Sequence, residues 1–282
     1  FRSSYLGMDV SALSPALDEM IQAGDVITDD EAIYLPPFYH SEVGTAKRLR
    51  TIFTSPDTIA VDTNGLQRRI QTATGMTYDE VQMQAILTAA QSKILILTGG
   101  AGTGKTTTTL GIIRAFQSAG ANILLAAPTG RAAKRMSEAT GMEAKTVHRL
   151  LEYKPPEGYQ RNEEAPLEGD VLIVDECSMI DIMLMYGLLK AVPDTMTLVF
   201  VGDIDQLPSV GAGNVLRDMI ESGAFPVVRL TRIFRQAQTS RIIMNAHRIN
   251  KGQMPDVSNG RNTDFFFVSR DTPEAAAQEL VQ

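Results

Sequence analysis

The sequence GGAGTGKT runs from Gly99 to Thr106 and decides the fold class. It matches the pattern G-x-x-x-x-G-K-[ST] and lies between an apolar run at residues 94–98 and a helical segment that continues to about residue 119. In this context the glycines allow backbone N–H groups to surround phosphate oxygens at a helix N-terminus. Lys105 would reach the β- and γ-phosphates of a nucleotide, and the Thr106 hydroxyl would ligate Mg²⁺. The residues expected to bind the nucleotide phosphates and Mg²⁺ are Gly99, Gly100, Ala101, Gly102, Thr103, Gly104, Lys105, Thr106 and Thr107.

Short apolar runs alternate with helical segments from residue 76 onward. Such alternation is typical of an α/β fold in which a mostly parallel sheet is covered by helices. Ligands of these sheets bind at the carboxyl ends of the strands. The expected strands cover residues 94–98, 123–127, 171–174, 197–201, 227–230 and 265–268.

Three polar residues follow two of these strands. Asp175 and Glu176 come directly after residues 171–174, and Gln206 lies in the segment GDIDQLP that follows residues 197–201. One carboxylate can hold Mg²⁺ through water while the other polarises an attacking water, so we assign Asp175 to the metal and Glu176 to the water. An uncharged amide such as Gln206 suits the sensing of a terminal phosphate. A helix N-cap pair and a plain turn are the alternatives, and the glycine-rich loop makes both less favourable.

Composition excludes several classes of protein. The 282 residues are 44% hydrophobic and 21% charged, with a single cysteine, Cys177. These values indicate a globular protein of a reducing, cytoplasmic compartment and exclude disulfide-stapled and fibrous proteins. No apolar run approaches the roughly 18 residues of a spanning helix, so no membrane partner is expected.

The charge is unevenly distributed along the chain. The net charge is −7, and acids are concentrated in residues 1–33. Residues 229–251 contain six basic residues and no acid, so they can hold phosphates locally although the chain as a whole is acidic. A solvated basic face is the alternative.

The chain divides into three parts. Residues 1–40 contain a helical stripe and a short hairpin, which suggests a partial winged-helix-like unit with a packing or protein-partner role. Residues 41–75 are expected to form a helical connector, and residues 76–282 the main domain. Prolines and a glycine at about residues 152–169 indicate a hairpin or loop insertion in that domain.

Six motifs in order carry a resemblance to a known family: GGAGTGKT, APTGRAAKRM, TVHRLL, VDECSM, VGDIDQLPSVGAG and LTRIFRQ. They resemble motifs I, Ia, Ib, II, III and IV of the RecD-like DNA helicases of superfamily 1, in particular the stand-alone type 2 branch, and also the α-subunit of exodeoxyribonuclease V. The resemblance covers residues 78 to about 267. It implies a RecA-like P-loop domain that binds ATP and Mg²⁺ and belongs to a 5′ to 3′ helicase acting on single-stranded and fork DNA. In this family Gln82, within YDEVQ, would pair with the adenine edge.

The resemblance also implies a path for the DNA backbone. Hydroxyls, N–H groups and basic side chains on successive loops can follow phosphates without reading sequence. The implied DNA-binding residues are Pro128, Thr129, Gly130, Arg131, Thr146, His148 and Arg149. The insertion would correspond to the family's pin, a wedge where strands separate, and Tyr153 or Tyr159 would stack on a base. An exposed loop aromatic without a ligand is the alternative.

Arg235 is the expected motif IV arginine that approaches the γ-phosphate, and Arg232 is its rival. The family carries further motifs on a second RecA-like domain, which this sequence does not contain. Because translocation needs two domains that close around ATP, we expect the fragment alone not to unwind DNA.

Two other readings remain. A P-loop ATPase of the AAA+ kind that remodels protein would show a polar Asn or Thr sensor in place of the Gly-Asp-x-x-Gln-Leu-Pro segment. A nucleotide-binding subunit of a recombination nuclease complex would act chiefly through partners, with the acidic N-terminal unit as a docking surface.

Overall fold

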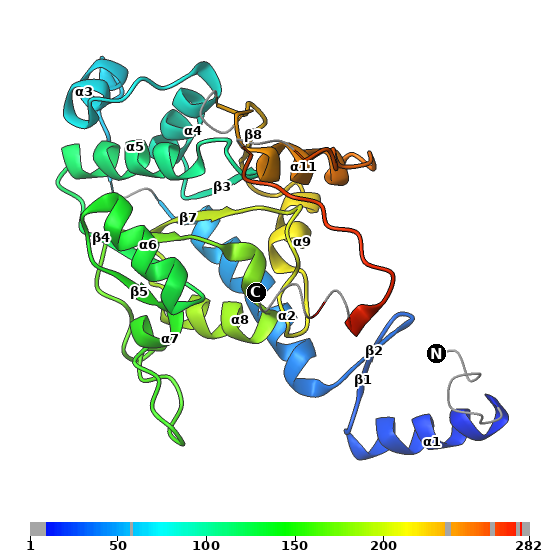
Figure 1. Ribbon diagram of the computed structural model, residues 1–282. Helices are drawn as coiled ribbons and strands as arrows, with labels where there is room; N and C mark the ends of the chain where they lie inside the picture. Colours follow the sequence, from blue (N-terminus) through cyan, green and yellow to red (C-terminus); the bar gives the residue numbers. More distant parts are fainter. Residues whose placement is uncertain (1–9, 57–58, 235–237, 260–262, 275–276, 278–282) are drawn as a thin grey trace.

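The computed structural model describes residues 10–56, 59–234, 238–259, 263–274 and 277, and a six-stranded parallel sheet lies at its centre (Figure 1). The strand order is β5-β4-β6-β7-β3-β8, and each neighbouring pair is parallel. The strands are β3 (Ile94–Gly99), β4 (Ile123–Ala127), β5 (Ala144–Thr146), β6 (Val171–Val174), β7 (Thr197–Gly202) and β8 (Val227–Leu230). The expected α/β class with a mostly parallel sheet is confirmed.

Helices cover both faces of the sheet. One face packs against α3 (Leu66–Thr74), α4 (Glu80–Gln91), α5 (Lys105–Ser118) and α6 (Gly130–Thr140). The other packs against α2 (Pro36–Thr54), α7 (Val147–Leu150), α8 (Ile182–Ala191) and α9 (Val215–Glu221). A short 3₁₀ turn, η2 (Cys177–Met179), follows β6, and α11 (Arg241–Asn250) follows β8.

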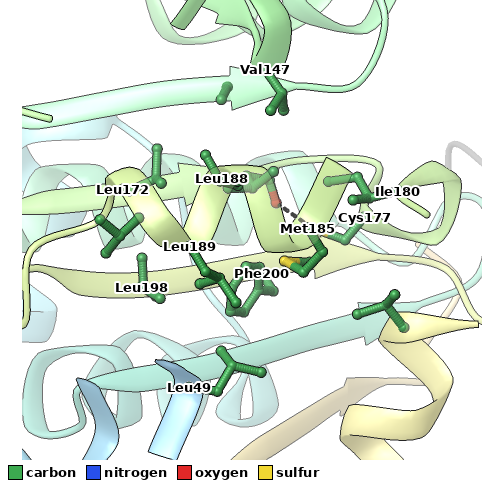
Figure 2. Packing of buried hydrophobic residues seen from close by; sticks show 14 of the residues in the cluster. Leu49, Val147, Leu172, Cys177, Ile180, Met185, Leu188, Leu189, Leu198 and Phe200 are labelled. Atoms are coloured by element: carbon green, nitrogen blue, oxygen red, sulfur yellow. Dashed lines mark hydrogen bonds between the residues drawn. The ribbon is translucent and has the colours of Figure 1, made fainter. Parts of the chain in front are cut away.

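Alternate residues of the central strands enter the two cores. In β7, Phe200 contributes to the core beneath α2 and α8, while its neighbour Val201 contributes to the core beneath α5. Successive side chains of a strand point to opposite faces, so a strand covered on both faces is apolar throughout. Figure 2 shows Leu198 and Phe200 packed with Leu188 and Leu189 of α8.

Helix α2 belongs to the core beneath the sheet. Its Gly44 approaches α8 so closely that a Cβ there would lie 2.2 Å from Cε2 of Tyr186. Nη2 of Arg48 donates to the Val192 carbonyl at 2.7 Å, and its Nη1 lies 2.8 Å from Asp194. The helix begins at Pro36, because proline is well tolerated in the first helical turn. The proline pair therefore ends the hairpin and starts a long helix.

The N-terminal unit consists of α1 (Val10–Ala23) and an antiparallel hairpin of β1 (Ile27–Asp29) and β2 (Ala32–Tyr34). In Figure 1 this unit extends away from the sheet. The insertion at residues 152–169 forms a loop in which Lys154 and Gly158 exchange two backbone hydrogen bonds, at 2.7 and 2.9 Å. The proposed domain boundaries at residues 40 and 75 stay a prediction.

One expected strand is absent, and one strand was not expected. Residues 265–268 form no strand, because the Asn259 side chain takes both backbone bonds of Phe267: Oδ1 accepts from its N–H, and Nδ2 donates to its carbonyl, each at 2.9 Å. Strand β5 was not expected, because a three-residue Ala-Lys-Thr segment carries no apolar run. It is defined by parallel pairing with β4.

Cys177 is buried directly after the carboxylate pair. Its Sγ donates to the Val174 carbonyl at 3.1 Å, and burial raises the pKa of the thiol well above its usual value. The thiol therefore stays protonated and serves as a packing group (Figure 2). Within the described ranges, no helix combines the length and the apolar character that crossing a bilayer requires.

Replacement of Phe200 by alanine should destabilise the fold by about 3–5 kcal/mol, because its ring is fully buried and its removal leaves a cavity between β7 and α8. Urea denaturation should show the lowered midpoint. The matched control is Phe266→Ala, which removes a ring that is 62% exposed and should change the stability by about 0.5 kcal/mol or less. Equal midpoints for the two variants would contradict the packing described for β7.

Candidate functional site

Lys105 of the glycine-rich loop, the half-buried Asp175 and the buried Asp203 meet at the carboxyl edge of the sheet. Strands β6, β7 and β3 are neighbours in that order, and their chains leave the sheet after Val174, Gly202 and Gly99. The residues that follow are Asp175, Asp203 and the glycine-rich loop. In parallel sheets this edge is where ligands bind.

The glycine-rich loop closes tightly onto α5. Gly104 has a φ of +85°, in the left-handed region that favours glycine, and it precedes Lys105, the first residue of α5. A Cβ at Gly104 would lie 2.6 Å from Nε2 of Gln82 and 2.8 Å from the Phe234 ring. Only glycine fits this position, which supports the expected role of the loop.

Lys105 is held in place by the loop that it follows. Its Nζ donates to the Gly99 carbonyl at 2.6 Å and to the Gly100 carbonyl at 3.1 Å. The same Nζ lies 3.9 Å from Oδ2 of Asp203, a carboxylate that is 5% exposed. The ammonium group is therefore pre-positioned beside the loop, where it balances a buried negative charge.

A cavity of about 760 Å³ lies over the loop, large enough for a nucleotide. It is lined by Met76, Thr77, Gln82, Gly100, Gly102, Thr103, Gly104, Lys105, Thr106, Thr107 and Phe234. Gly99 and Ala101, which were expected to bind the nucleotide, do not line this cavity. Gly99 is buried at the end of β3, and the Ala101 carbonyl accepts a hydrogen bond from His247.

Gln82 is a buried amide with one end unsatisfied. Its side-chain Oε1 accepts from the backbone N–H of Asp79 at 3.1 Å, and its backbone N–H donates to Oδ1 of Asp79 at 2.9 Å. These two hydrogen bonds form a capping box at the start of α4. Its Nε2 is buried without a hydrogen-bond partner among the described residues, and the residue lines the nucleotide-sized cavity. A buried donor without a partner costs stability unless a ligand satisfies it.

Asp175 and Glu176 line a second cavity of about 140 Å³ together with Thr106. Oδ1 of Asp175 accepts from the Glu176 N–H at 2.8 Å, and burial raises the pKa of both carboxyls. Glu176 has a φ of +53°, and its Oε2 is buried with no partner among the described residues. The left-handed backbone at a non-glycine residue is strained, as is common at functional sites.

The donor set of this cavity fits Mg²⁺. A threonine hydroxyl and a carboxylate are hard oxygen ligands, and Mg²⁺ typically uses one or two protein ligands together with phosphate oxygens and water. Thr106 and Asp175, which line the same cavity, would be these two ligands. The unpartnered oxygen of Glu176 adds a further acceptor at the same place.

Asp203 is a central residue that the sequence interpretation missed. Its Oδ2 accepts from Nε2 of Gln206 at 3.1 Å, and the same oxygen lies 3.9 Å from Nζ of Lys105. Gln206 is exposed but reaches the phosphate loop through this carboxylate. The signal was present in the Gly-Asp pair that ends the apolar run of β7.

The expected DNA-binding residues form two adjacent loops. Ala127, the last residue of β4, lies opposite Thr146 of β5, so both strands end at the same edge. Oγ1 of Thr129 caps α6 by accepting from Ala132 N at 3.2 Å, and Oγ1 of Thr146 caps α7 in the same way. Arg131, His148 and Arg149 are exposed at these two helix starts.

Three rings gather where the insertion leaves α7. The His148 and Tyr153 ring centroids lie 5.8 Å apart, and those of Tyr153 and Tyr159 lie 5.2 Å apart. Tyr153 is 48% exposed, while Tyr159 is partly buried against Gly187, and burial raises the pKa of its phenol. Of the two tyrosines, Tyr153 is thus the one whose ring remains available to a ligand.

The basic run at residues 229–251 is only partly available for phosphate binding. Arg241 pairs with Asp256 at 2.8 Å, and Arg232 lies 3.8 Å from Asp79. Arg235, the expected γ-phosphate arginine, lies outside the described residues. His247, which was not expected at the site, donates from Nε2 to the Ala101 carbonyl at 2.9 Å and places α11 against the phosphate loop.

Comparisons with known proteins found one family model and several relatives in sequence. A family model described as an AAA domain matches residues 82–212. The chain is 37% identical over 248 residues to an ATP-dependent RecD2 DNA helicase of Deinococcus radiodurans, which covers 88% of this chain and 34% of that protein. It is also 34% identical over 246 residues to a RecBCD enzyme subunit RecD of Mycobacterium tuberculosis. This match covers 79% of this chain and 40% of that protein.

Among solved structures, the Pif1 helicase from Candida albicans matches 64% of this chain and 46% of that chain, with 24% sequence identity and a TM-score of 0.49. The chain spans between 34% and 40% of the length of the two curated relatives described.

Proposed function

The chain is related in sequence to the RecD-like proteins of helicase superfamily 1, and from this relationship we propose that it forms the N-terminal motor half of an ATP-dependent 5′ to 3′ DNA helicase. In this proposal it binds ATP, Mg²⁺ and single-stranded DNA, and it needs a second RecA-like domain to unwind a duplex. The stepping direction follows from the family resemblance.

The observation that carries the proposal is the meeting of Lys105, Asp203 and Gln206 beside the Asp175-Glu176 pair at one sheet edge. A phosphate-loop lysine, a metal-binding carboxylate and a carboxylate for water are the parts that phosphoryl transfer to water requires. The unpartnered Nε2 of Gln82 supports recognition of the adenine edge, because a purine offers acceptors that the buried amide lacks.

Each residue then has a chemical task. Lys105 would bind the β- and γ-phosphate oxygens, while Thr106 and Asp175 would hold Mg²⁺. When bound, the metal ion neutralises charge on the phosphates. Glu176 would accept the proton of the attacking water, and Gln206 would report the presence of the γ-phosphate through Asp203. We retain Arg235 as the arginine that approaches the γ-phosphate.

Single-stranded DNA would run along the starts of α6 and α7. The hydroxyls of Thr129 and Thr146, the exposed cations Arg131 and Arg149, and the ring of His148 lie on the two adjacent loops that end β4 and β5. Such a path can bind phosphates without reading sequence. The insertion at residues 152–169 would act as the pin at a DNA fork.

A role inside a larger complex is the second proposal. One relative is named as a subunit of the RecBCD enzyme, and the acidic N-terminal unit offers a surface for a protein partner. Affinity capture with the full-length protein distinguishes a stand-alone helicase from a subunit of a larger complex, because a stand-alone helicase should not retain nuclease subunits. In either case we place the protein in the cytoplasm, because the DNA substrate is found there and the reducing conditions keep the Cys177 thiol reduced.

The DNA path predicts a salt dependence. Affinity of the full-length protein for single-stranded DNA should fall as salt rises, with a slope of about −0.7 in log–log form per phosphate neutralised. Replacement of Arg131 by alanine should reduce the slope by somewhat less than one unit while nucleotide affinity stays unchanged. Fluorescence anisotropy of a labelled oligonucleotide at several salt concentrations measures both slopes. Wild-type affinity that is insensitive to salt would contradict the proposed path.

A further inference from the structure

The small cavity beside the carboxylate pair has a second wall that nucleotide chemistry does not explain. Besides Asp175, Glu176 and two threonines of α5, it is lined by Ala132, Arg135, Met136, Ala139 and Thr140, all from α6. Their spacing of three and four residues places them on one face of that helix. Arg135 is the one cation among the described residues that line the cavity.

Arg135 shares this cavity with Glu176. The two side chains line one cavity of about 140 Å³. Oε2 of Glu176 is buried without a hydrogen-bond partner among the described residues. An uncompensated carboxylate oxygen of this kind is costly, and the guanidinium of Arg135 is the cationic group that lines the same cavity.

The neighbouring lysine does not line this cavity. Lys134 is 79% exposed, and its Nζ lies 3.9 Å from Glu138, one turn along the solvent face of α6. It carries the same charge as Arg135 and belongs to the same helix, but it does not line the cavity. The two residues therefore form a matched pair.

Helix α6 also begins at the proposed DNA path. Thr129 caps it, and Arg131 lies one turn before Arg135 on the same face. Strand β4, which precedes α6, is also hydrogen-bonded to the Asp175–Glu176 segment: the Asp175 N–H donates to the Ala126 carbonyl at 2.9 Å. One short rigid element thus connects the DNA path with the cavity that holds Glu176.

We propose that Arg135 is a positioning residue that couples DNA binding at the start of α6 to the orientation of Glu176. DNA phosphates at Thr129 and Arg131 fix α6, and Arg135 then directs the Glu176 carboxylate toward the attacking water. The inference rests on the proposed ATPase function and assigns the DNA-dependent control of that function to one side chain.

The test measures ATP hydrolysis by the full-length protein with and without a single-stranded oligonucleotide. Replacement of Arg135 by glutamine should reduce the DNA stimulation ratio by roughly 10-fold or more, because a misplaced catalytic group lowers the rate of the chemical step. The KM for ATP and the affinity for the oligonucleotide should stay close to wild type. Arg135→Lys should restore part of the stimulation, since it returns the charge without the planar guanidinium.

Lys134→Gln is the matched control, and it should retain full stimulation. If Arg135→Gln is stimulated like wild type, or if Lys134→Gln loses as much stimulation, the coupling role is refuted. Loss of DNA affinity in Arg135→Gln would also refute it, because Arg135 would then be a phosphate ligand. The same experiment separates failure of the coupling role from failure of the proposed function. If DNA does not stimulate ATP hydrolysis by the wild-type protein, the helicase proposal is overturned, and the coupling role with it.

Discussion

Replacement of Glu176 by glutamine is expected to lower DNA-stimulated ATP turnover of the full-length protein by about 100-fold or more, while ATP binding is retained. Glu176 follows the buried strand β6, and its Oε2 is buried without a partner among the described residues. An amide of nearly the same shape fills this space but cannot accept the proton of the attacking water. Steady-state phosphate release and equilibrium binding of a fluorescent ATP analogue measure the two quantities.

The control for this substitution is Glu221→Gln, which changes an exposed carboxylate at the end of α9 and should leave turnover unchanged. Undiminished hydrolysis by Glu176→Gln would show that the carboxylate has only a structural role. Loss of ATP binding in that variant would instead indicate that Glu176 holds the metal ion, and the assignments of Asp175 and Glu176 would have to be exchanged.

The fold and half of the site could be predicted from the sequence because both depend on local pattern. Five strands were recognisable as apolar runs: β3, β4, β6 and β7 are buried, because a strand covered on both faces admits no polar alternation, and β8 is an edge strand in which only Arg229 is polar. Lys105, Asp175 and Glu176 were recognisable because they come directly after such strands. In a parallel sheet, residues that follow neighbouring strands must meet at one edge.

The remaining features depend on contacts between distant parts of the chain. His247 bonds to Ala101 across 146 positions, and no local pattern announces that contact. Asp203 resembles a turn residue until its strand is found beside β3, where its carboxylate faces Lys105. Residues 265–268 have the composition of a strand, but the Asn259 side chain satisfies the backbone of Phe267 without a neighbouring strand.

Arg135 illustrates the same limit on a helix. The segment APTGRAAKRM places two cations side by side, and only the packing of α6 reveals that Arg135 faces the cavity while Lys134 faces Glu138. Helical spacing predicts which residues share a face, but it does not predict which face is turned toward a carboxylate on another element.

The second large effect is expected at Lys105. Replacement by alanine should weaken nucleotide binding about 100-fold or more, which corresponds to roughly 3 kcal/mol, because a charge-assisted contact to the β- and γ-phosphates is lost. In the structure Nζ already lies beside the loop, bonded to the Gly99 and Gly100 carbonyls, so little ordering is needed when phosphate arrives. Calorimetric titration with a non-hydrolysable ATP analogue and Mg²⁺ measures the change.

The substitution also leaves Asp203 without the ammonium group that lies 3.9 Å away, so a folding control is needed. The double replacement of Lys105 by alanine and Asp203 by asparagine removes both charges, and it should recover any thermal stability lost by the single variant without recovering nucleotide affinity. Lys134→Ala, which removes an exposed lysine from α6, should bind the nucleotide like wild type. Tight binding by a folded Lys105→Ala variant would mean that the glycine-rich loop closes the chain between β3 and α5 without serving as a phosphate site.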